Sequence, residues 1–374
     1  MYRNEALQPG ELNRHDDTRD GNEGLESEWP RVDVVILNWK HSKDTILCLE
    51  SVLRSDYPNY RVIVCDNDSQ DESLEVITAW SSGSLTPEIP ESAPFRRLTV
   101  PPVKKPVSVR ELDCLPTHLP KTADGNDKVL SMIQTGSNLG FAGGCNVGIA
   151  YALQHAAAYV LLLNNDACVE ADAISQLVSV ARDADAAIVG VRIMDDTGTR
   201  ELFSGASWPA QLFHLSSSRR KSVDRTYWNS CYASGCGMLI RRDLLERRFL
   251  EFNYYFDPAY FMYCEDVDLC LFGLAHGHKC VVARDAVAHH GHAKSSGGSF
   301  NPRSYYYVTR NRILLANRWL DSRWKALFHF YYAPSRLVVL PFIRLFRWRW
   351  RTLSAVCSGM VDGYLGVIGR WKHH

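Results

Sequence analysis

Unbroken apolar runs that end in polar residues recur along this chain, and they predict its framework. In the clearest of them, residues 159–163 read Tyr-Val-Leu-Leu-Leu and are followed at once by Asn164, Asn165 and Asp166. A run without polar alternation predicts a strand buried on both faces, as in the middle of a parallel sheet. Ligands bind at the carboxyl ends of such strands, which makes the three polar residues a candidate site. Taken alone, they are more typical of a simple turn.

The first part of the chain repeats this pattern twice. Residues 32–37 predict a buried strand that ends at Asn38, and residues 61–65 predict a second one that ends at Asp66. Helical periodicity follows each strand, so the segment has the βαβ layout of a nucleotide-binding sheet. No glycine-rich dinucleotide fingerprint follows the first strand, which argues against a nicotinamide or flavin enzyme.

A glycine-rich stretch opens a predicted helix that runs to about His155, after a short predicted strand at residues 129–135. It reads Asn138-Leu-Gly140-Phe-Ala-Gly-Gly-Cys-Asn146-Val-Gly. Glycine lets the backbone approach a ligand closely, and a helix N-terminus offers unpaired N–H groups to an anion. The same spacing is equally typical of a tight strand-to-helix turn.

Three carboxylates stand in the first turn of a later predicted helix, behind the aromatic residues 260–263. They are Glu265, Asp266 and Asp268. The helix macrodipole stabilises an acid in this position by about 0.3–1 kcal/mol. That effect accounts for one or two acids better than for a flanked cluster of three.

A histidine cluster follows the strand-like residues 280–283. His289, His290 and His292 fall within four positions. A lone histidine is more often structural, but a cluster at the exit of a strand is a candidate set of metal ligands.

Composition narrows the class of protein. The formal net charge is zero, so no overall field favours nucleic acid. The eleven cysteines include no Cys-x-x-Cys pair, which predicts free thiols in a reducing, cytoplasmic setting. Residues 1–30 are polar and acidic and are predicted to be disordered, residues 81–127 are predicted to form a surface insertion, and residues 195–230 are expected to be irregular.

The C-terminal part differs from the rest. Residues 318–374 carry ten Lys and Arg against two acids, together with five of the ten Trp. The apolar run at 337–346 is too short for a bilayer span, which needs about 20 apolar residues. The mixture suits either a helix in a membrane interface or a helical layer packed on the preceding domain.

Taken in order, these motifs resemble family 2 inverting glycosyltransferases with the GT-A fold, most closely the bacterial rhamnosyltransferase-like branch. The resemblance covers roughly residues 32–315 apart from the insertion. It implies an α/β fold with a mostly parallel central sheet flanked by helices, a catalytic domain at residues 31–315, and a helical, basic and aromatic tail at 316–374. The matching motifs are Asn38-Trp39, Asp66-Asn67-Asp68-Ser69, the stretch from Asn138 to Asn146, Asn164-Asn165-Asp166, Gly235-Cys-Gly-Met-Leu-Ile-Arg241, Glu265-Asp266-Val-Asp268, His289-His290 and Arg310-Asn311.

The resemblance implies a divalent metal, Mg²⁺ or Mn²⁺, that helps the nucleoside diphosphate to leave. In the family an Asp-x-Asp motif binds this metal. Here Asp166 matches its second acid and Asn164 replaces the first. His289 matches a downstream histidine near the diphosphate, with His290 as its rival. Contacts with the donor are expected from the matched motifs, namely Asn38, Asp66, Asn138, Gly140, Asn146, Asn164 and Asn165.

Asp266 matches the family's catalytic base, and Glu265 beside it is expected to orient the acceptor or the base. One departure is Phe272, where the family often has Arg. The implied partners are a nucleotide-diphosphate sugar, with dTDP-rhamnose as the first guess, and a glycan or lipid-linked glycan acceptor in polysaccharide synthesis. The implied location is the cytoplasmic face of the membrane.

Two rival functions remain open at this point. One is a non-catalytic sugar-nucleotide-binding or scaffold subunit, which loss of Asp166 or Asp266 would have favoured. The other is a nucleotidyltransferase, which normally has a glycine-rich phosphate loop where Asn38-Trp39-Lys40-His41 stands here.

Overall fold

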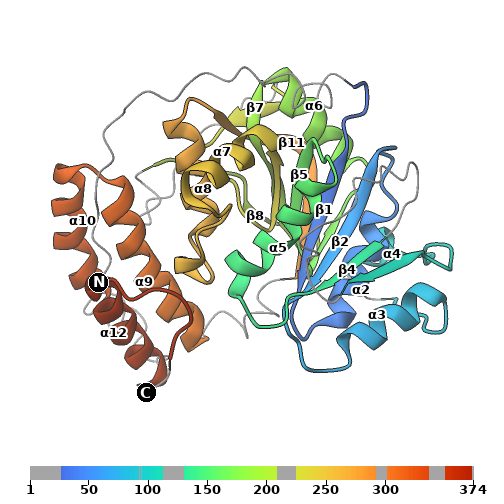
Figure 1. The fold of residues 1–374 in the computed structure, drawn as a ribbon, viewed down its shortest axis with the longest axis horizontal. Helices are drawn as coiled ribbons and strands as arrows, with labels where there is room; N and C mark the ends of the chain where they lie inside the picture. The colour runs from blue at the N-terminus through green and yellow to red at the C-terminus, as the bar shows by residue number, and fades with distance from the viewer. Residues whose placement is uncertain are drawn as a thin grey trace.

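The computed structural model describes residues 27–91, 93, 95–112, 130–208, 225–291, 301–336 and 350–372. Helices cover both faces of a central sheet, and the last helices of the chain stand together at one end of the molecule (Figure 1). The predicted disorder at residues 1–30 lies almost wholly outside the described residues, as do residues 113–127 of the predicted insertion.

Eleven of the described strands form one mixed sheet. The order along its main path is β3-β4-β2-β1-β5-β10-β7-β11-β6, with β8 beside β7 and β9 beside β11. The strands are β1 (Val32–Asn38), β2 (Tyr60–Asp66), β3 (Val109–Leu112), β4 (Leu130–Gln134), β5 (Tyr159–Asn164), β6 (Ala167–Val169), β7 (Ala186–Asp195), β8 (Glu201–Phe203), β9 (Tyr227–Asn229), β10 (Gly237–Arg241) and β11 (Lys279–His290).

The half of the sheet that begins at β3 and ends at β5 is parallel throughout. β10 then runs antiparallel between β5 and β7, whereas β11 is parallel to β7. The predicted α/β fold with a mostly parallel sheet is therefore confirmed. The predicted irregular stretch at 195–230 is corrected by β8 and β9, and the predicted insertion contributes an edge strand, β3.

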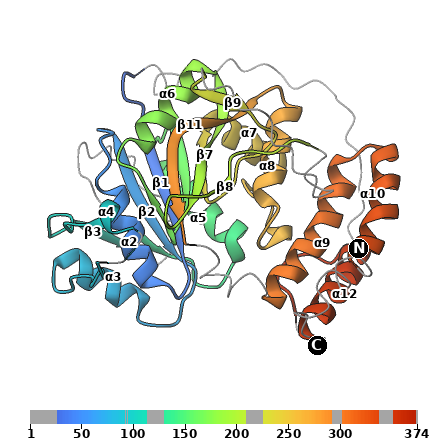
Figure 2. The same ribbon diagram turned by 180° about the vertical axis from the view of Figure 1, so that it is seen from behind.

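The helices lie on both faces of the sheet and beyond its end (Figure 2). They are α2 (Ser42–Val52), α3 (Ser73–Ser82), α4 (Arg96–Thr99), α5 (Gly140–Gln154), α6 (Ala173–Asp183), α7 (Arg242–Phe252), the 3₁₀ turn η1 (Pro258–Tyr260), α8 (Glu265–Ala275), α9 (Pro302–Trp319), α10 (Ser322–Pro334) and α12 (Trp350–Leu365).

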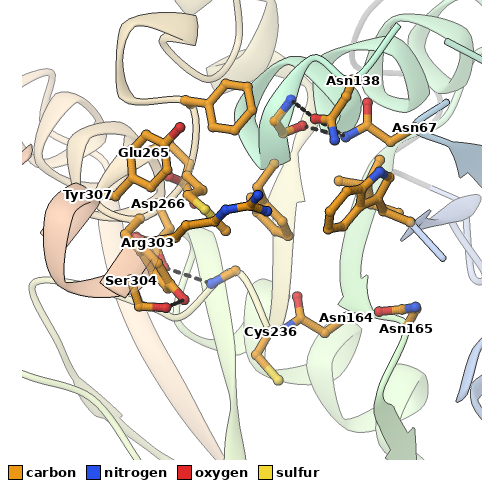
Figure 3. A pocket seen from close by; sticks show the side chains of 18 of the residues that line it. Asn67, Asn138, Asn164, Asn165, Cys236, Glu265, Asp266, Arg303, Ser304 and Tyr307 are labelled. Atoms are coloured by element: carbon orange, nitrogen blue, oxygen red, sulfur yellow. Dashed lines mark hydrogen bonds between the residues drawn. The ribbon is translucent and has the colours of Figure 1, made fainter. Parts of the chain in front are cut away.

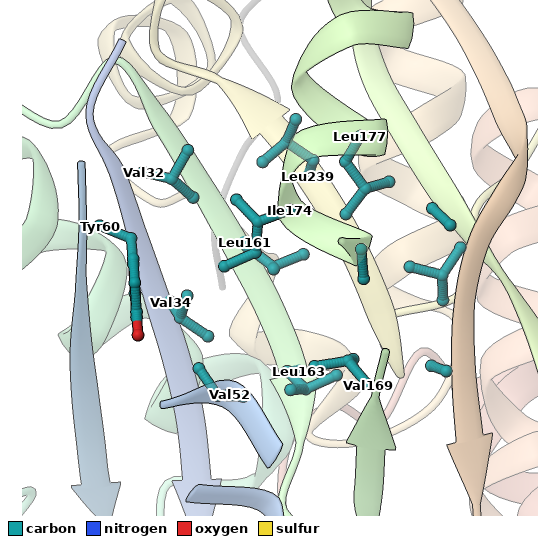
Figure 4. Close-up of a cluster of buried hydrophobic side chains, with 14 of the residues drawn as sticks. Val32, Val34, Val52, Tyr60, Leu161, Leu163, Val169, Ile174, Leu177 and Leu239 are labelled. Carbon is teal, nitrogen blue, oxygen red and sulfur yellow. The ribbon is translucent and has the colours of Figure 1, made fainter. Parts of the chain in front are cut away.

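The central strands are apolar on both sides because each side faces a separate core. Val34 and Leu161 point into the cluster under α2, α3 and α6, which Figure 4 shows from close by. The alternate residues Val35 and Leu162 point into a second cluster with α5, α7 and α8. Successive side chains of a strand face opposite ways, so the unbroken apolar runs are what a sheet covered on both faces requires.

The described part of the insertion is held in place by a buried acid, Glu50 of α2. Its carboxylate accepts hydrogen bonds from Trp80 Nε1 (2.8 Å), the backbone N–H of Val103 (2.6 Å) and Lys105 Nζ (3.1 Å). Lys105 also stands 3.5 Å above the centre of the Trp80 ring. This segment is therefore packed against the domain rather than loosely attached.

In the C-terminal part, α12 packs closely along α9, and glycines make the approach possible. A Cβ at Gly359 would stand 2.6 Å from the carbonyl oxygen of Tyr306, and one at Gly363 would stand 2.8 Å from Ile313 Cδ1. In the described part of the tail, α12 thus packs on α9. None of the described helices is both long and apolar enough to cross a bilayer.

Candidate active site

A cavity of about 580 Å³ opens at the carboxyl ends of β1, β2 and β5. One wall comes from the sheet, and the other comes from α8, the start of α9 and the last residues of the chain. Figure 3 shows Asn164 and Asn165 on the sheet side and Glu265 and Asp266 across from them. The site predicted at the strand ends is thus enclosed by two walls of different origin.

A hydrogen-bonded chain of buried side chains lies behind the sheet wall of the cavity and supports it. Asn38 Nδ2 donates to Asp66 Oδ1 (2.7 Å), and Asn38 Oδ1 accepts from Thr45 Oγ1 (2.8 Å). Thr45 Oγ1 in turn accepts from Asn165 Nδ2 (3.1 Å). Asn38 and Asp66 are 0% and 4% exposed and do not line the cavity, whereas Asn165 does. Buried polar groups satisfied in this way fix the ends of three strands relative to one another.

Asn67 lines the cavity although the sequence analysis did not select it. Its Nδ2 donates to the carbonyl oxygen of Gly140 (3.1 Å), and its Oδ1 accepts from the N–H of Leu139 (3.0 Å). Asn67 therefore joins the end of β2 to the start of α5. It lies in the matched motif next to Asp66, which was the available signal.

Within the glycine-rich stretch, Asn138 and Gly140 line the cavity and Asn146 does not. Asn138 Oδ1 accepts from the N–H of Gly140 (3.0 Å). Gly140 has φ +73°, and a Cβ there would collide with the carbonyl oxygen of Phe261. The amide of Asn146 instead bonds both backbone groups of Phe256, at 2.8 and 2.7 Å. Asn146 was expected to contact the donor, but in the structure it holds the loop before η1 instead.

Asp166 lies just behind the cavity surface, 4% exposed, with His290 beside it. His290 lines the cavity, and its Nε2 is 3.0 Å from Asp166 Oδ1. His289 points the other way, because consecutive residues of β11 alternate in direction. Its Nε2 is 2.8 Å from Glu170 Oε1 and 3.0 Å from Arg97 Nη2. The geometry therefore favours His290 over the expected His289 as the partner of Asp166, while His292 lies outside the described residues.

Asp166 and His290 together are compatible with one divalent cation. Among the described residues no group of three or more His, Cys, Asp or Glu side chains converges on one point. Mg²⁺ is commonly bound through only one or two carboxylates, and phosphates of the substrate and water complete its shell. The pair supplies one carboxylate oxygen and one imidazole nitrogen, so it fits a metal that arrives with a diphosphate.

Asp266 is held at the start of α8 by backbone donors. Its Oδ2 accepts from the N–H of Gly235 (3.0 Å), and its Oδ1 accepts from the N–H of Val267 (2.8 Å). Burial raises the pKa of Asp266, and these backbone bonds oppose the rise because they favour the charged form. The carboxylate is therefore oriented, and its proton affinity is greater than that of an exposed Asp.

Glu265 also lines the cavity but is 4% exposed, and its Oε2 has no hydrogen-bond partner among the described residues. Burial raises the pKa of Glu265 well above its usual value, and the nearby charge of Asp266 raises it further. Two adjacent buried carboxyls do not both ionise easily. The geometry favours a charged Asp266 beside a protonated Glu265, since Asp266 holds the backbone donors.

The third acid, Asp268, is structural. It is fully buried and accepts from Trp319 Nε1 (2.7 Å), Arg318 Nη1 (3.0 Å) and the guanidinium of Arg248. The Arg248 guanidinium also lies 4.7 Å from the centre of the Phe272 ring. Arg248 is thus the cation that lies beside Phe272, the residue at which the sequence departs from the family it resembles.

The loop before α8 is strained and is held from α9. Phe261, Tyr263 and Cys264 have φ of 64°, 67° and 75°, which costs of the order of 1–3 kcal/mol for each such residue. The buried Asn311 Nδ2 donates to the carbonyl oxygens of Tyr260 (2.9 Å), Met262 (2.8 Å) and Tyr263 (2.8 Å). The matched Arg310-Asn311 motif therefore fixes the loop that presents Glu265 and Asp266.

The chain's last described residues form an arm, residues 366–372, that returns to the cavity. Arg310 Nη1 donates to the carbonyl oxygen of Gly369 (2.6 Å), and the N–H of Gly369 donates to the carbonyl oxygen of Ala259 (2.8 Å). Arg370 and Trp371 then line the cavity together with Arg303, Ser304 and Tyr307 of α9. The sequence analysis did not select these residues, and its signal for Arg370 and Trp371 was the basic, Trp-rich character of the tail.

Comparison with known proteins agrees with this architecture. The model of the glycosyl transferase family 2 matches residues 33–89 and 116–249, just over half of the chain. A search among curated protein sequences found no significant match.

Among solved structures, the chain is similar to S. aureus TarS in complex with UDP-GlcNAc, with 15% identity and a TM-score of 0.51 over 90% of this chain and 81% of that one. It is also similar to the mannosyltransferase PcManGT from Pyrobaculum calidifontis in complex with GDP-Man and Mn²⁺, with 14% identity and a TM-score of 0.52 over 92% of each chain. At such identities the likeness establishes the GT-A fold. Together with the family match, it shows that the chain belongs to glycosyl transferase family 2.

Proposed function

We propose that this glycosyltransferase moves a sugar from a nucleotide-diphosphate donor to a hydroxyl of a glycan or lipid-linked glycan, with inversion at the anomeric carbon. Rhamnose from dTDP-rhamnose is the first candidate donor, and polysaccharide synthesis the candidate setting. The observation that carries the proposal is Asp266. Its carboxylate lines the cavity and is oriented by the N–H groups of Gly235 and Val267.

Asp266 has the properties of a general base. It accepts the proton of the attacking hydroxyl while the new glycosidic bond forms and the bond to the diphosphate breaks. A single displacement of this kind inverts the anomeric carbon. A protonated Glu265 leaves one negative charge next to the reacting centre and offers a hydrogen bond to the acceptor. Its Oε2 has no other hydrogen-bond partner among the described residues, which supports this role.

Asp166 and His290 are the proposed metal ligands, and a divalent cation between them would stabilise the charge that grows on the departing diphosphate. The chain's own residues bind the rest of the donor. Asn67, Asn138 and Asn165 offer amide groups along the sheet wall, and Arg303 extends from α9 into the cavity (Figure 3). Nucleotide sugars bound to the two similar structures are consistent with this use of the cavity.

Peripheral contact with the cytoplasmic face of a membrane is part of the proposal. It is supported by exposed apolar side chains on α10, α12 and the arm, chiefly Phe330 (83% exposed), Trp350 (87%), Leu365 (73%) and Ile368 (61%). Large apolar side chains next to Lys and Arg are typical of surfaces that lie in a membrane interface.

The proposal is tested with a panel of nucleotide sugars that includes dTDP-rhamnose, UDP-GlcNAc and GDP-mannose. Slow donor hydrolysis in the presence of Mn²⁺ or Mg²⁺ should single out one sugar and one nucleotide, and EDTA should suppress it. With an acceptor in hand, NMR of the product should show the anomer opposite to that of the donor. A retained anomer would refute the mechanism, because one base and one displacement only invert.

A further inference from the structure

A second cleft, of about 880 Å³, adjoins the cavity and shares part of its lining. Asn301, Arg303 and Trp371 line both spaces. From there the cleft extends along α12 past Ser354 and Ser358 to Trp350. The two spaces therefore meet at these three residues, so that a ligand long enough to bridge them would have one end near Asp266 and the other at the outer surface of the C-terminal layer.

The charges along this path are mostly positive. Arg303 and Arg370 line the inner end, whereas Arg351 and Lys372 line the outer cleft. None of the four makes a salt bridge or a side-chain hydrogen bond to another described residue. The acid among the described residues of the cleft, Asp362, accepts a hydrogen bond from Tyr306 (2.5 Å). A row of exposed cations without anionic partners suits a phosphate, because guanidinium and ammonium groups are the side chains that bind it best.

The arm that carries two of these cations is held firmly rather than loosely. The Trp371 ring stacks on Tyr306 at 4.4 Å between centres and 10° between planes, and the N–H of Trp371 donates to Tyr307 Oη (2.8 Å). The bonds of Gly369 to Arg310 and Ala259 fix the preceding turn. Trp371 therefore offers a partly exposed, pre-oriented aromatic face at the junction of the cavity and the cleft.

We infer that the acceptor carries a phosphate or diphosphate group, which this cleft binds through Arg351, Lys372 and Arg370 while Trp371 packs against the adjoining sugar or alkyl part. The inference rests on the proposed function, since it places the reacting hydroxyl of the same acceptor in the cavity next to Asp266. Two sources share this chemistry, a lipid-linked diphosphate and a soluble sugar phosphate.

Binding of small probes to the full chain tests the inference without turnover. Geranyl diphosphate represents the lipid-linked source, glucose 1-phosphate represents the soluble source, and octyl glucoside is an uncharged probe with both a sugar and an alkyl tail. Calorimetry or Trp fluorescence should detect binding of at least one phosphate probe and little binding of octyl glucoside. The tighter phosphate probe identifies the source.

The double variant R351Q/K372Q removes the two outer cations. Its affinity for the phosphate probe should fall about tenfold or more, because charge-assisted hydrogen bonds are lost. Trp371→Ala should weaken the same probe. The control Lys104→Gln removes an exposed cation near β3, at the opposite end of the molecule from α12 (Figure 2), and should change nothing.

UDP and dTDP affinities are measured for each variant as a separate readout. They should be unchanged in R351Q/K372Q, so a failure of donor binding in all forms counts against the proposed function and not against the cleft. The inference is overturned if octyl glucoside binds as tightly as the phosphate probes. It is also overturned if the double variant binds them like the unaltered protein.

Discussion

The two walls of the cavity are built in different ways. The sheet wall consists of residues at or just after the ends of strands, such as Asn67 after β2 and Asn164 and Asn165 at the end of β5. The helical wall draws on segments far apart in the chain, since Asp266 starts α8 and Arg370 and Trp371 lie on the arm. The first wall is a consequence of strand order, and the second depends on contacts that only the complete fold creates.

This difference separates the tasks of the two walls. On the sheet wall, strand pairing and the Asn38–Asp66 bond fix the positions of the residues that we propose to bind the donor and its metal. On the helical wall, a strained loop held by Asn311 presents Asp266, and the arm closes the side of the cavity that we propose for the acceptor. We therefore expect substitutions on the sheet wall to act on donor and metal binding, and those on the helical wall to act on turnover and on the acceptor.

The largest expected effect is that of Asp266→Asn. This change keeps the size of the side chain and the acceptor oxygen for one backbone N–H but removes the base, so turnover should fall about 10²–10⁴-fold with donor affinity little changed. Glu265→Gln keeps a hydrogen-bond donor in place of the protonated acid, so its turnover should fall much less. Single-turnover rates compare the two, and a greater loss for Glu265→Gln would transfer the role of base to Glu265.

The pH dependence of turnover in the unaltered enzyme gives a second test of Asp266 as the base. Burial raises the pKa of Asp266, and its charged form is the proposed base. Turnover should therefore be lost as the pH falls through the pKa of Asp266, which is higher than the pKa of an ordinary Asp. The acidic limb of the pH–rate profile should be absent in the residual activity of Asp266→Asn.

On the sheet wall, Asp166→Ala should reduce turnover by about a hundredfold or more, since several kcal/mol of charge stabilisation are lost with the metal. Mn²⁺-dependent binding of the donor nucleotide should be lost as well. The variants His290→Ala and His289→Ala show which of the two neighbouring histidines is the metal ligand. The first should raise the Mn²⁺ concentration needed for half-maximal activity, whereas the second, which faces Glu170, should leave it nearly unchanged. The reverse result would restore His289 as the ligand.

The part of the fold and of the site that could be predicted from the sequence also differs between the two walls. Apolar runs and the polar residues after them predicted β1, β2 and β5 and, on the sheet wall, Asn164 and Asn165, because period and strand direction are local properties. The choice between His289 and His290 was not accessible, because it depends on the register in which β11 pairs with β6 and β7. Arg370 and Trp371 could not be selected either, since their place depends on long-range bonds from Arg310 and Tyr307.

The support of the helical wall is tested by Asn311→Ala. The carbonyl oxygens of Met262 and Tyr263 lose the Asn311 donor, and that of Tyr260 keeps only its other donors, such as Arg310 Nη2. The free energy of unfolding should therefore fall by about 1–3 kcal/mol. Loosening the loop should also lower kcat more than it raises KM for the donor, which a purely structural role elsewhere would not do. Thermal unfolding and steady-state kinetics measure the two effects. The control is Asn317→Ala. Asn317 is exposed, lies on the same helix and is bonded only to His329 among the described residues, so this change should show neither effect.

The smallest expected effect concerns the outer surface of the helical wall, where the protein is proposed to meet a membrane. Phe330 on α10 and Leu365 at the end of α12 are 83% and 73% exposed, so F330S/L365S should leave the fold intact. Each side chain would bury only part of its apolar area in a membrane interface. We therefore expect binding to anionic liposomes to fall about tenfold in sedimentation assays, with activity on a soluble acceptor unchanged.

The matched control for this surface is Leu250→Ser. Leu250 is 84% exposed but lies on α7, away from α10 and α12 (Figure 1), so its loss should not change liposome binding. High salt should weaken the binding that remains in F330S/L365S, because that part depends on Lys and Arg near the anionic surface. Equal partitioning of all three proteins would leave the C-terminal layer with its packing role alone, and the acceptor would then have to reach the cavity from solution.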